Sequence, residues 1–229
     1  MAKSTFLQLC QDTRRECGVA GAGPTNVAGQ SGILEKIVRW VQYSDMEIQG
    51  RWNDWRFMHR ADWKVNTVAS QAIVYAPDDL GGWDDDSFFI NHEQPTYWKL
   101  SPVGYQDYRN IHRQGPQISN KPVFVSVMPD NNLVLIPPPS TTYSLSADYW
   151  RKPKKLVNNT DTSYIPEEYE RIIITRAALL FAGDNGSIDM IASFQVEYDD
   201  ILDKLEAKYL PGQAARRLSS APSMVVRPQ

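Results

Sequence analysis

The chain has 229 residues, a formal net charge of -3 and 42% hydrophobic residues. This length allows one or two domains with a buried core, and the near-neutral charge argues against a general nucleic-acid binder, which is normally strongly basic. No stretch approaches the roughly 18 consecutive apolar residues of a membrane span, so we expect neither a signal peptide nor a transmembrane helix.

The first 50 residues indicate two helices joined by a loop. Ser4 can cap a first helix that runs to about Glu16, and a second helix is expected from about Ser31 to Gly50. The loop between them is rich in glycine and lacks the Lys-Ser/Thr ending of a phosphate-binding loop. The apolar stripe of the first helix is Phe6, Leu9, Cys10, Thr13 and Cys17. We expect both cysteines to be buried, reduced thiols.

The segment "RWNDWRFMHR", residues 51–60, places four apolar or aromatic side chains among three arginines. Aromatic rings interleaved with arginine can stack on nucleic-acid bases. Alternatively, the aromatic rings close the junction between the helices and the sheet that follows, while the arginines remain solvated. The sequence favours the second interpretation. The residues concerned are Trp52, Trp55, Phe57 and Met58, with Arg51, Arg56 and Arg60.

Residues 61–152 change to a period of two, which is typical of strands. Candidate strands are "DWKVNTV", "QAIVYA", "SFFINH", "TYWKL", "PVFVSVM", "NLVLIP" and "TYSLSADYW". "PDNN" reads as a hairpin turn, and short strands between turns favour antiparallel pairing. The acidic stretch "APDDLGGWDDDS" is predicted to be a solvated loop tip that binds no metal tightly, because its spacing does not match a calcium loop. Its acids are Asp78, Asp79, Asp84, Asp85 and Asp86.

The C-terminal part returns to helices. Pro166 suits the first position of a helix that Gly183 would end, and a last helix is expected from about Ser187 to Lys208, before Pro211. The sequence therefore predicts an α+β fold in which N- and C-terminal helices form a four-helix layer, with an inserted antiparallel β region and an extended C-terminal tail. The expected boundaries are 1–60 and 153–210 for the helices, 61–152 for the β region and 211–229 for the tail.

No catalytic or metal motif is found. The histidines His59, His92 and His112 lack ligand-spaced partners, so we expect no metal site, no cofactor and no enzymatic activity. Two alternatives remain open. A wall hydrolase would need a carboxylate pair, for which Glu47, Glu93 and Glu168 are the candidates. A carbohydrate-binding module could use Trp83, Tyr97 and Trp98 as a platform.

Several motifs in one order resemble the head-to-tail adaptor proteins of tailed bacteriophages. They are the glycines of "GVAGAGP", Gly29-Gln30, Ile48-Gln49, the "DWRFM" segment from Asp54 to Met58, the "PDNN" hairpin with its proline break, the "YWRKP" exit and "YIPEEYERIIITRAALLFAGDNG". The resemblance covers nearly the whole chain and leaves the acidic stretch unmatched. It implies a structural virion protein at the head-tail junction, made in the host bacterial cytoplasm. A related alternative is a tail-tube or gatekeeper protein.

The same resemblance implies a ring, usually of twelve subunits, that docks under the portal protein, contacts the next tail component and lets DNA pass with transient, non-specific contact. We expect a monomer or small oligomer before assembly. The C-terminal tail is expected to dock on the portal, because a disordered segment with grouped apolar residues can bind a groove or a sheet edge. The residues expected to dock are Arg216, Arg217, Leu218, Met224, Val225, Val226 and Arg227.

Overall fold

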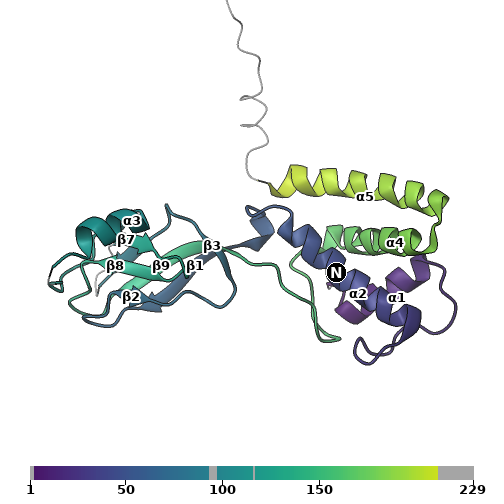
Figure 1. Ribbon diagram of the computed structural model, residues 1–229, viewed down its shortest axis with the longest axis horizontal. Coiled ribbons are helices and arrows are strands. Elements are labelled where there is room, and N and C mark those ends of the chain that lie inside the picture. Colours follow the sequence, from purple (N-terminus) through teal and green to yellow (C-terminus); the bar gives the residue numbers. More distant parts are fainter. Residues whose placement is uncertain (1–2, 93–96, 116, 211–229) are drawn as a thin grey trace, which may run out of the picture. The chain divides into compact units, whose positions relative to one another are not determined.

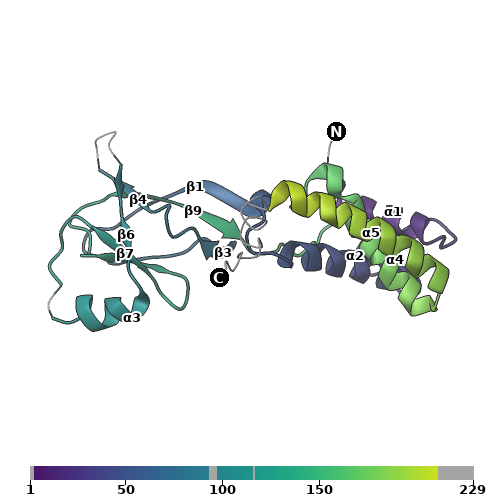
Figure 2. The same ribbon diagram turned by 90° about the horizontal axis from the view of Figure 1, so that it is seen from above.

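The computed structural model describes residues 3–92, 97–115 and 117–210, and its fold is α+β (Figures 1 and 2). The described residues group into two compact units. The helical unit contains residues 3–57 and 153–210, and the β unit contains residues 58–152. The β unit is therefore inserted between two halves of the helical unit.

The helical unit contains four long helices and two short turns. Thr5, rather than Ser4, caps the first helix, because its hydroxyl accepts from the backbone of Gln8 while the Gln8 side chain accepts from the backbone N–H of Thr5. The predicted apolar stripe of this helix is fully confirmed as buried. The elements are α1 (Phe6–Glu16), α2 (Gly32–Gly50), η1 (Arg56–Met58, at the boundary between the units), η3 (Glu167–Tyr169), α4 (Arg171–Asn185) and α5 (Ile188–Tyr209).

Helix α4 occupies the centre of the helical unit and packs against α1, α2 and α5 (Figures 1 and 2). Its buried residues lie on almost all sides, so its sequence shows little amphipathic period. Both predicted ends of this helix are wrong. Pro166 precedes the short turn η3 and α4 begins only at Arg171, while the helix continues past Gly183 to Asn185. Gly186, with φ of 65°, takes the left-handed position that ends the helix.

The β unit contains two sheets. The strands are β1 (His59–Asn66), β2 (Ile73–Val74), β3 (Leu80–Trp83), β4 (Phe89–Asn91), β5 (Trp98–Lys99), β6 (Ser101–Pro102), β7 (Phe124–Val127), β8 (Leu133–Ile136) and β9 (Ser144–Arg151). One sheet has the order β1-β9-β4-β5, with β3 also paired to β9, and the other has the order β2-β8-β7-β6. Antiparallel pairing is confirmed, except that β6 and β7 pair in parallel.

The core of the β unit draws on both sheets. The alternate residues Tyr143, Leu145, Ala147 and Tyr149 are buried and form the apolar face of the last strand. The β7–β8 hairpin is also confirmed, with Asn131 in its turn at φ of 66° and Val127 opposite Leu133. The principal core residues are Val74, Phe88, Ile90, Leu100, Val125, Leu133, Leu135, Tyr143, Leu145 and Ala147.

Three elements of the β unit were not predicted. One is a short helical segment formed by α3 (Tyr105–Asp107) and the following π-type turn η2 (Tyr108–His112). The others are the two-residue strand β6 and the strand β3, which lies inside the acidic stretch. A Cβ atom on Gly81 would lie 2.9 Å from the carbonyl carbon of Arg151. Only glycine lets the backbone of β3 approach β9 so closely.

Candidate partner-binding site at the end of helix α5

The residues that were expected to dock a partner follow Leu210 and lie outside the described residues. These are Arg216, Arg217, Leu218, Met224, Val225, Val226 and Arg227. The structure does describe the end of α5, where this segment begins. Leu210 is buried, and its backbone N–H donates to the carbonyl of Glu206. The segment therefore starts from a fixed point on the helical unit.

An aromatic cluster holds the end of α5. The ring of Tyr209 meets Phe57 and Tyr169 edge-on, with centroids 5.6 and 5.9 Å apart, respectively. Phe57 stacks on Trp55 at 5.0 Å, and the fully buried Trp55 donates its indole N–H to the carbonyl of Ile48 over 3.1 Å. Trp55 and Phe57 therefore serve in packing within the helical unit, and Trp55 is not exposed for stacking on bases.

Two glutamates add polar contacts around this cluster. Glu206 accepts from the guanidinium of Arg51 over 3.0 Å and from the indole of Trp52 over 2.9 Å. Glu168 accepts from the ammonium of Lys208 over 2.9 Å and from the hydroxyl of Tyr209 over 2.8 Å. The hydrogen bond from Lys208 is the main reason that the pKa of Glu168 is lowered to about 2. Helix α5 is thus tied to α2 and to the start of α4 close to its last residue.

A buried carboxylate fixes the segment that leads into α4. Asp45 accepts from the hydroxyl of Ser163 and from the amide of Gln49, the latter over 2.7 Å. Burial raises the pKa of Asp45 to about 6, although these bonds and the nearby Lys3 and Lys154 act in the opposite direction. This network was not predicted from the sequence. Its signal is two polar residues four apart, Asp45 and Gln49, on an otherwise apolar face of α2.

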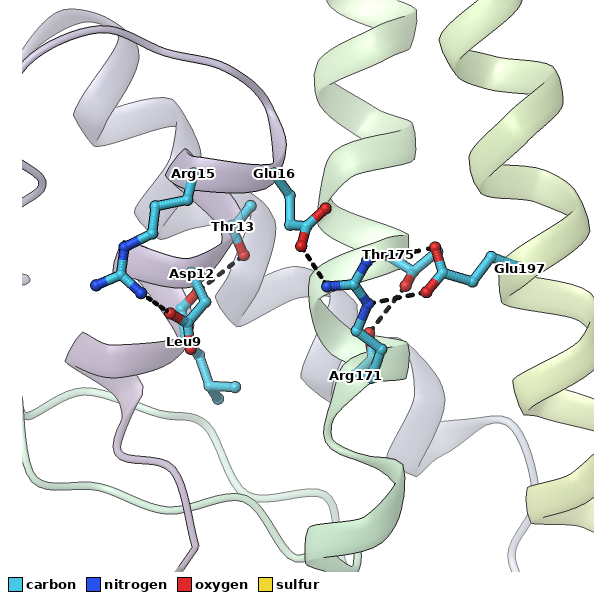
Figure 3. Close-up of polar contacts among 8 residues, drawn as sticks. All are labelled: Leu9, Asp12, Thr13, Arg15, Glu16, Arg171, Thr175 and Glu197. Atoms are coloured by element: carbon cyan, nitrogen blue, oxygen red, sulfur yellow. Dashed lines mark hydrogen bonds and ion pairs between the residues drawn. The ribbon is translucent and has the colours of Figure 1, made fainter.

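An arginine joins three of the helices (Figure 3). Arg171, at the start of α4, contacts Glu16 on α1 and donates to Glu197 on α5 over 2.8 Å. Both contacts raise the pKa of Arg171 above its ordinary value. Figure 3 shows the guanidinium between the two carboxylates, while the nearby pair Arg15 and Asp12, 2.6 Å apart, stays within α1.

A family model described as SU10 adaptor protein matches residues 4–227. The chain belongs to the SU10 adaptor protein family. The resemblance to phage head-to-tail adaptors is therefore confirmed over nearly the whole chain. No curated protein matches the chain in the corresponding sequence search.

Two of the three carboxylates considered for a hydrolase lie in the described part of the adaptor, and each of them is engaged in another contact. Glu47 forms an ion pair with Arg176 over 2.9 Å, Glu168 is used at the end of α5, and Glu93 lies outside the described residues. A glycosidase acid needs a raised pKa, whereas that of Glu168 is lowered. Among the described residues, no group of three His, Cys, Asp or Glu side chains could hold a metal ion. In the same part of the chain, every helix is too short or too polar to cross a bilayer.

The three aromatic residues considered for carbohydrate binding do not form the exposed platform that this alternative requires. Trp83 packs against Trp63, Phe88 and Tyr149, and its indole N–H donates to the carbonyl of Asn131 over 2.8 Å. The ammonium of Lys121 lies 3.5 Å from the centre of the Trp98 ring and covers that face. Tyr97 alone of the three is well exposed.

The acidic stretch of the adaptor is more ordered than the sequence predicted. Asp79 accepts from the hydroxyl of Tyr149 over 2.7 Å, and Ser87 donates to the carbonyl of Asp84 over 2.6 Å. Burial, followed by the bond to Asp79, raises the pKa of Tyr149 to about 12. The prediction of a solvated loop tip is correct for Asp78, Asp85 and Asp86 and wrong for the rest, because β3 pairs with β9 within the stretch.

Proposed function

We propose that this protein is a structural head-to-tail adaptor that forms a ring, joins the portal to the tail and lines the channel through which DNA leaves the capsid. The observation that carries the proposal is the family match, which extends from residue 4 to residue 227. The proposed partners are the portal protein, the next tail component and further copies of the chain, which form a ring of twelve subunits on the portal.

The helices suit the role of a rigid wedge in such a ring. We propose that α1, α2, α4 and α5 act together as a four-helix layer, because α4 packs on the other three. The ion pairs of Arg171 to Glu16 and Glu197 support this by joining α1, α4 and α5. A ring repeats one contact between different faces until it closes, and stiff subunits keep the angle of that contact constant.

The segment 211–229 is the proposed portal-docking element. After Glu206 the sequence has no acidic residue, whereas Lys208, Arg216, Arg217 and Arg227 are basic. Met224, Val225 and Val226 form an apolar group that can fill a groove or add to a sheet edge. One weak contact repeated around a ring becomes strong through avidity. The fixed end of α5 at Tyr209 and Leu210 supports this role, since it gives each copy the same starting point.

The test combines purified portal rings with the full chain and with a chain that lacks residues 213–229. We expect negative-stain images to show a ring stacked on the portal for the full chain and bare portals for the truncated one. Circular dichroism melts of the two chains should coincide, because the described core has its own packing without those residues. Completion of infectious particles by the truncated chain would exclude docking through this segment.

A paired set of variants separates the two kinds of docking residue. Serine at Leu218, Met224, Val225 and Val226 removes the apolar group, and glutamine at Arg216, Arg217 and Arg227 removes the charges. We expect the serine variant to lose portal binding at every salt concentration. The glutamine variant should bind more weakly than the parent protein at low salt and about equally at high salt. The difference disappears because high salt already screens the arginine charges of the parent protein.

A further inference from the structure

A cavity of about 220 Å³ opens beside helix α3 in the β unit, and we call it the α3 cavity. Phe88, Val125 and Val127 form its apolar floor, and the first two of these side chains are buried. Tyr105 on α3 and Asp85 in the acidic stretch also line it, and α3 lies beside β7 in both views (Figures 1 and 2). Pockets for drug-sized ligands measure about 300–1,000 Å³, so this cavity suits one large side chain of a protein partner.

Two carboxylates lie at the edge of the α3 cavity without a basic partner. Asp85 is exposed and forms no ion pair within the described residues. Asp107 is also exposed, and a Cβ atom on the lining residue Gly104 would lie 3.5 Å from its Oδ2 atom. The ammonium of Lys99 is held by Asp86 over 3.1 Å, and none of the described residues that line the cavity is a base. The cavity therefore combines an apolar floor with a negatively charged edge.

The segment that follows α5 carries the complementary chemistry. Arg216 and Arg217 place two bases directly before the large apolar side chain of Leu218. No acidic residue follows Glu206, so nothing in this segment repels the carboxylates of the cavity. Successive side chains of an extended segment point to opposite sides, so Arg216 and Leu218 share one side and lie about 7 Å apart. Leu218 can then enter the cavity while Arg216 lies over its edge.

The segment is long enough to leave its own helical unit. Leu218 lies eight positions beyond Leu210, whose side chain is buried in that unit. An extended chain spans at most about 3.3–3.6 Å per residue, so Leu218 can lie up to roughly 28 Å from this fixed point. A neighbouring copy can present its cavity within this reach. A contact between copies also sets no condition on the placement of the two units within one chain.

We propose that Leu218 of one copy of this chain fills the α3 cavity of another copy. Arg216 then faces Asp85 and Asp107 at the edge of that cavity. Because the contact joins two different surfaces, each copy in a ring gives its segment to one neighbour and receives that of the other. The inference deepens the proposed function and rests on it, since it assigns part of the docking segment to the ring itself and leaves residues 224–226 for the portal.

Chemical cross-linking tests the contact between copies. A chain carrying Ser219→Cys, directly after the docking leucine, is mixed with a chain carrying Gln106→Cys on α3 and treated with a short bismaleimide, with and without portal rings. Gln106 is exposed and does not line the cavity. The native Cys10 and Cys17 are buried, and burial raises the pKa of their thiols to about 12 and about 11, so they should not react. We expect a covalent dimer from the mixture and only background from either variant alone.

The matched control replaces Gln106→Cys by Gln71→Cys. Gln71 is an exposed glutamine of the same unit, and it lines a different groove of about 250 Å³. Its mixture with Ser219→Cys should give only background. Equal cross-linking through Gln71, or no dimer from the test mixture at any protein concentration, overturns the proposal.

Substitutions in the segment separate this contact from docking on the portal. Adding Leu218→Ser to the Ser219→Cys chain should abolish the covalent dimer, whereas adding V225S/V226S should leave the dimer formed without portal. A dimer that survives Leu218→Ser contradicts the inference. Portal binding without the dimer would exclude this contact alone, and a dimer without portal binding would exclude only the proposed function.

A labelled synthetic peptide of residues 211–222 measures the part of the charges. It is titrated with the full-length protein and followed by fluorescence anisotropy. We expect Asp85→Asn and Asp107→Asn each to weaken binding by about two- to fivefold at low salt, the range of an exposed ion pair, and by less at high salt. Asp78→Asn should have no effect, because Asp78 is an exposed acid of the same stretch that does not line the cavity. Equal effects of all three substitutions would assign the attraction to the overall charge of the β unit and overturn the pairing.

Discussion

Tyr209 donates its hydroxyl to Glu168 over 2.8 Å and thereby ties the last turn of α5 to the turn before α4. Replacing Tyr209→Phe removes only this bond, and we expect a small loss of stability because the site is exposed to solvent. Replacing Tyr209→Ala also removes the ring contacts with Phe57 and Tyr169. Hydrogen exchange of the amides in residues 203–210 should be fastest for the alanine variant. Equal exchange in all three proteins would contradict the anchoring role.

The buried carboxyl of Asp45 predicts a specific pH dependence. Its pKa is about 6 in the folded protein, above its ordinary value of 3.8. Below pH 3.8 the carboxyl is protonated in both states, and between these values the unfolded chain ionises first. The free energy of unfolding should therefore fall as pH rises from about 4 to about 6. Denaturant titrations of Asp45→Asn should show a flatter dependence in that window, while an unchanged slope would assign the effect to another group.

Arg171 should contribute more to the free energy of unfolding than an arginine whose ion pair stays within one helix. We expect Arg171→Met to lower the free energy of unfolding by about 1–2 kcal/mol, a value reduced for solvent screening. The matched change Arg15→Met removes a single exposed contact with Asp12 and should cost less than about 0.5 kcal/mol. Urea unfolding followed by circular dichroism compares the two, and equal losses would show that the contacts with Glu16 and Glu197 contribute nothing special.

Gly81 and Gly82 are adjacent but should tolerate alanine differently. A Cβ atom at Gly81 would meet the backbone of β9 at 2.9 Å, whereas one at Gly82 would meet no other atom within 4 Å. We expect Gly81→Ala to destabilise the β unit by about 1–3 kcal/mol, the usual cost of overpacking. Gly82→Ala should be nearly neutral. Thermal unfolding of both variants measures the difference, and a reversed order would mean that β3 does not approach β9 as described.

Helices and strands that bury one face were predictable, because burial on one side gives the apolar residues of the sequence a clear period. The stripe from Phe6 to Cys17 and the strand face from Tyr143 to Tyr149 illustrate this, and both are buried. The ends of α4 were not predictable from glycine and proline alone. Gly183 looks like a stop signal, but tertiary packing on three sides continues the helix to Asn185, and Gly186 provides the left-handed turn.

The contacts of the candidate site were harder to predict from the sequence than the helices and strands. The Asp45 network depends on Ser163, which is 118 positions away, and no local pattern reports such a partner. Strand β3 was not predicted, because two glycines and several aspartates are typical of loops. Only its pairing with β9 makes this segment a strand. The docking residues from Arg216 to Arg227 remain a prediction from composition and resemblance.

The insertion of the β unit has a consequence for the order of events during synthesis. The nine strands found among the described residues lie between residues 59 and 151, so this unit can complete its pairing as soon as it leaves the ribosome. Helices α1 and α2 emerge earlier, yet the side chains that cover them come from α4, more than 100 residues later. The apolar side chains of α1 and α2 that α4 covers therefore stay exposed until α4 is made, and this interval is when a nascent chain is most exposed to aggregation and to chaperones.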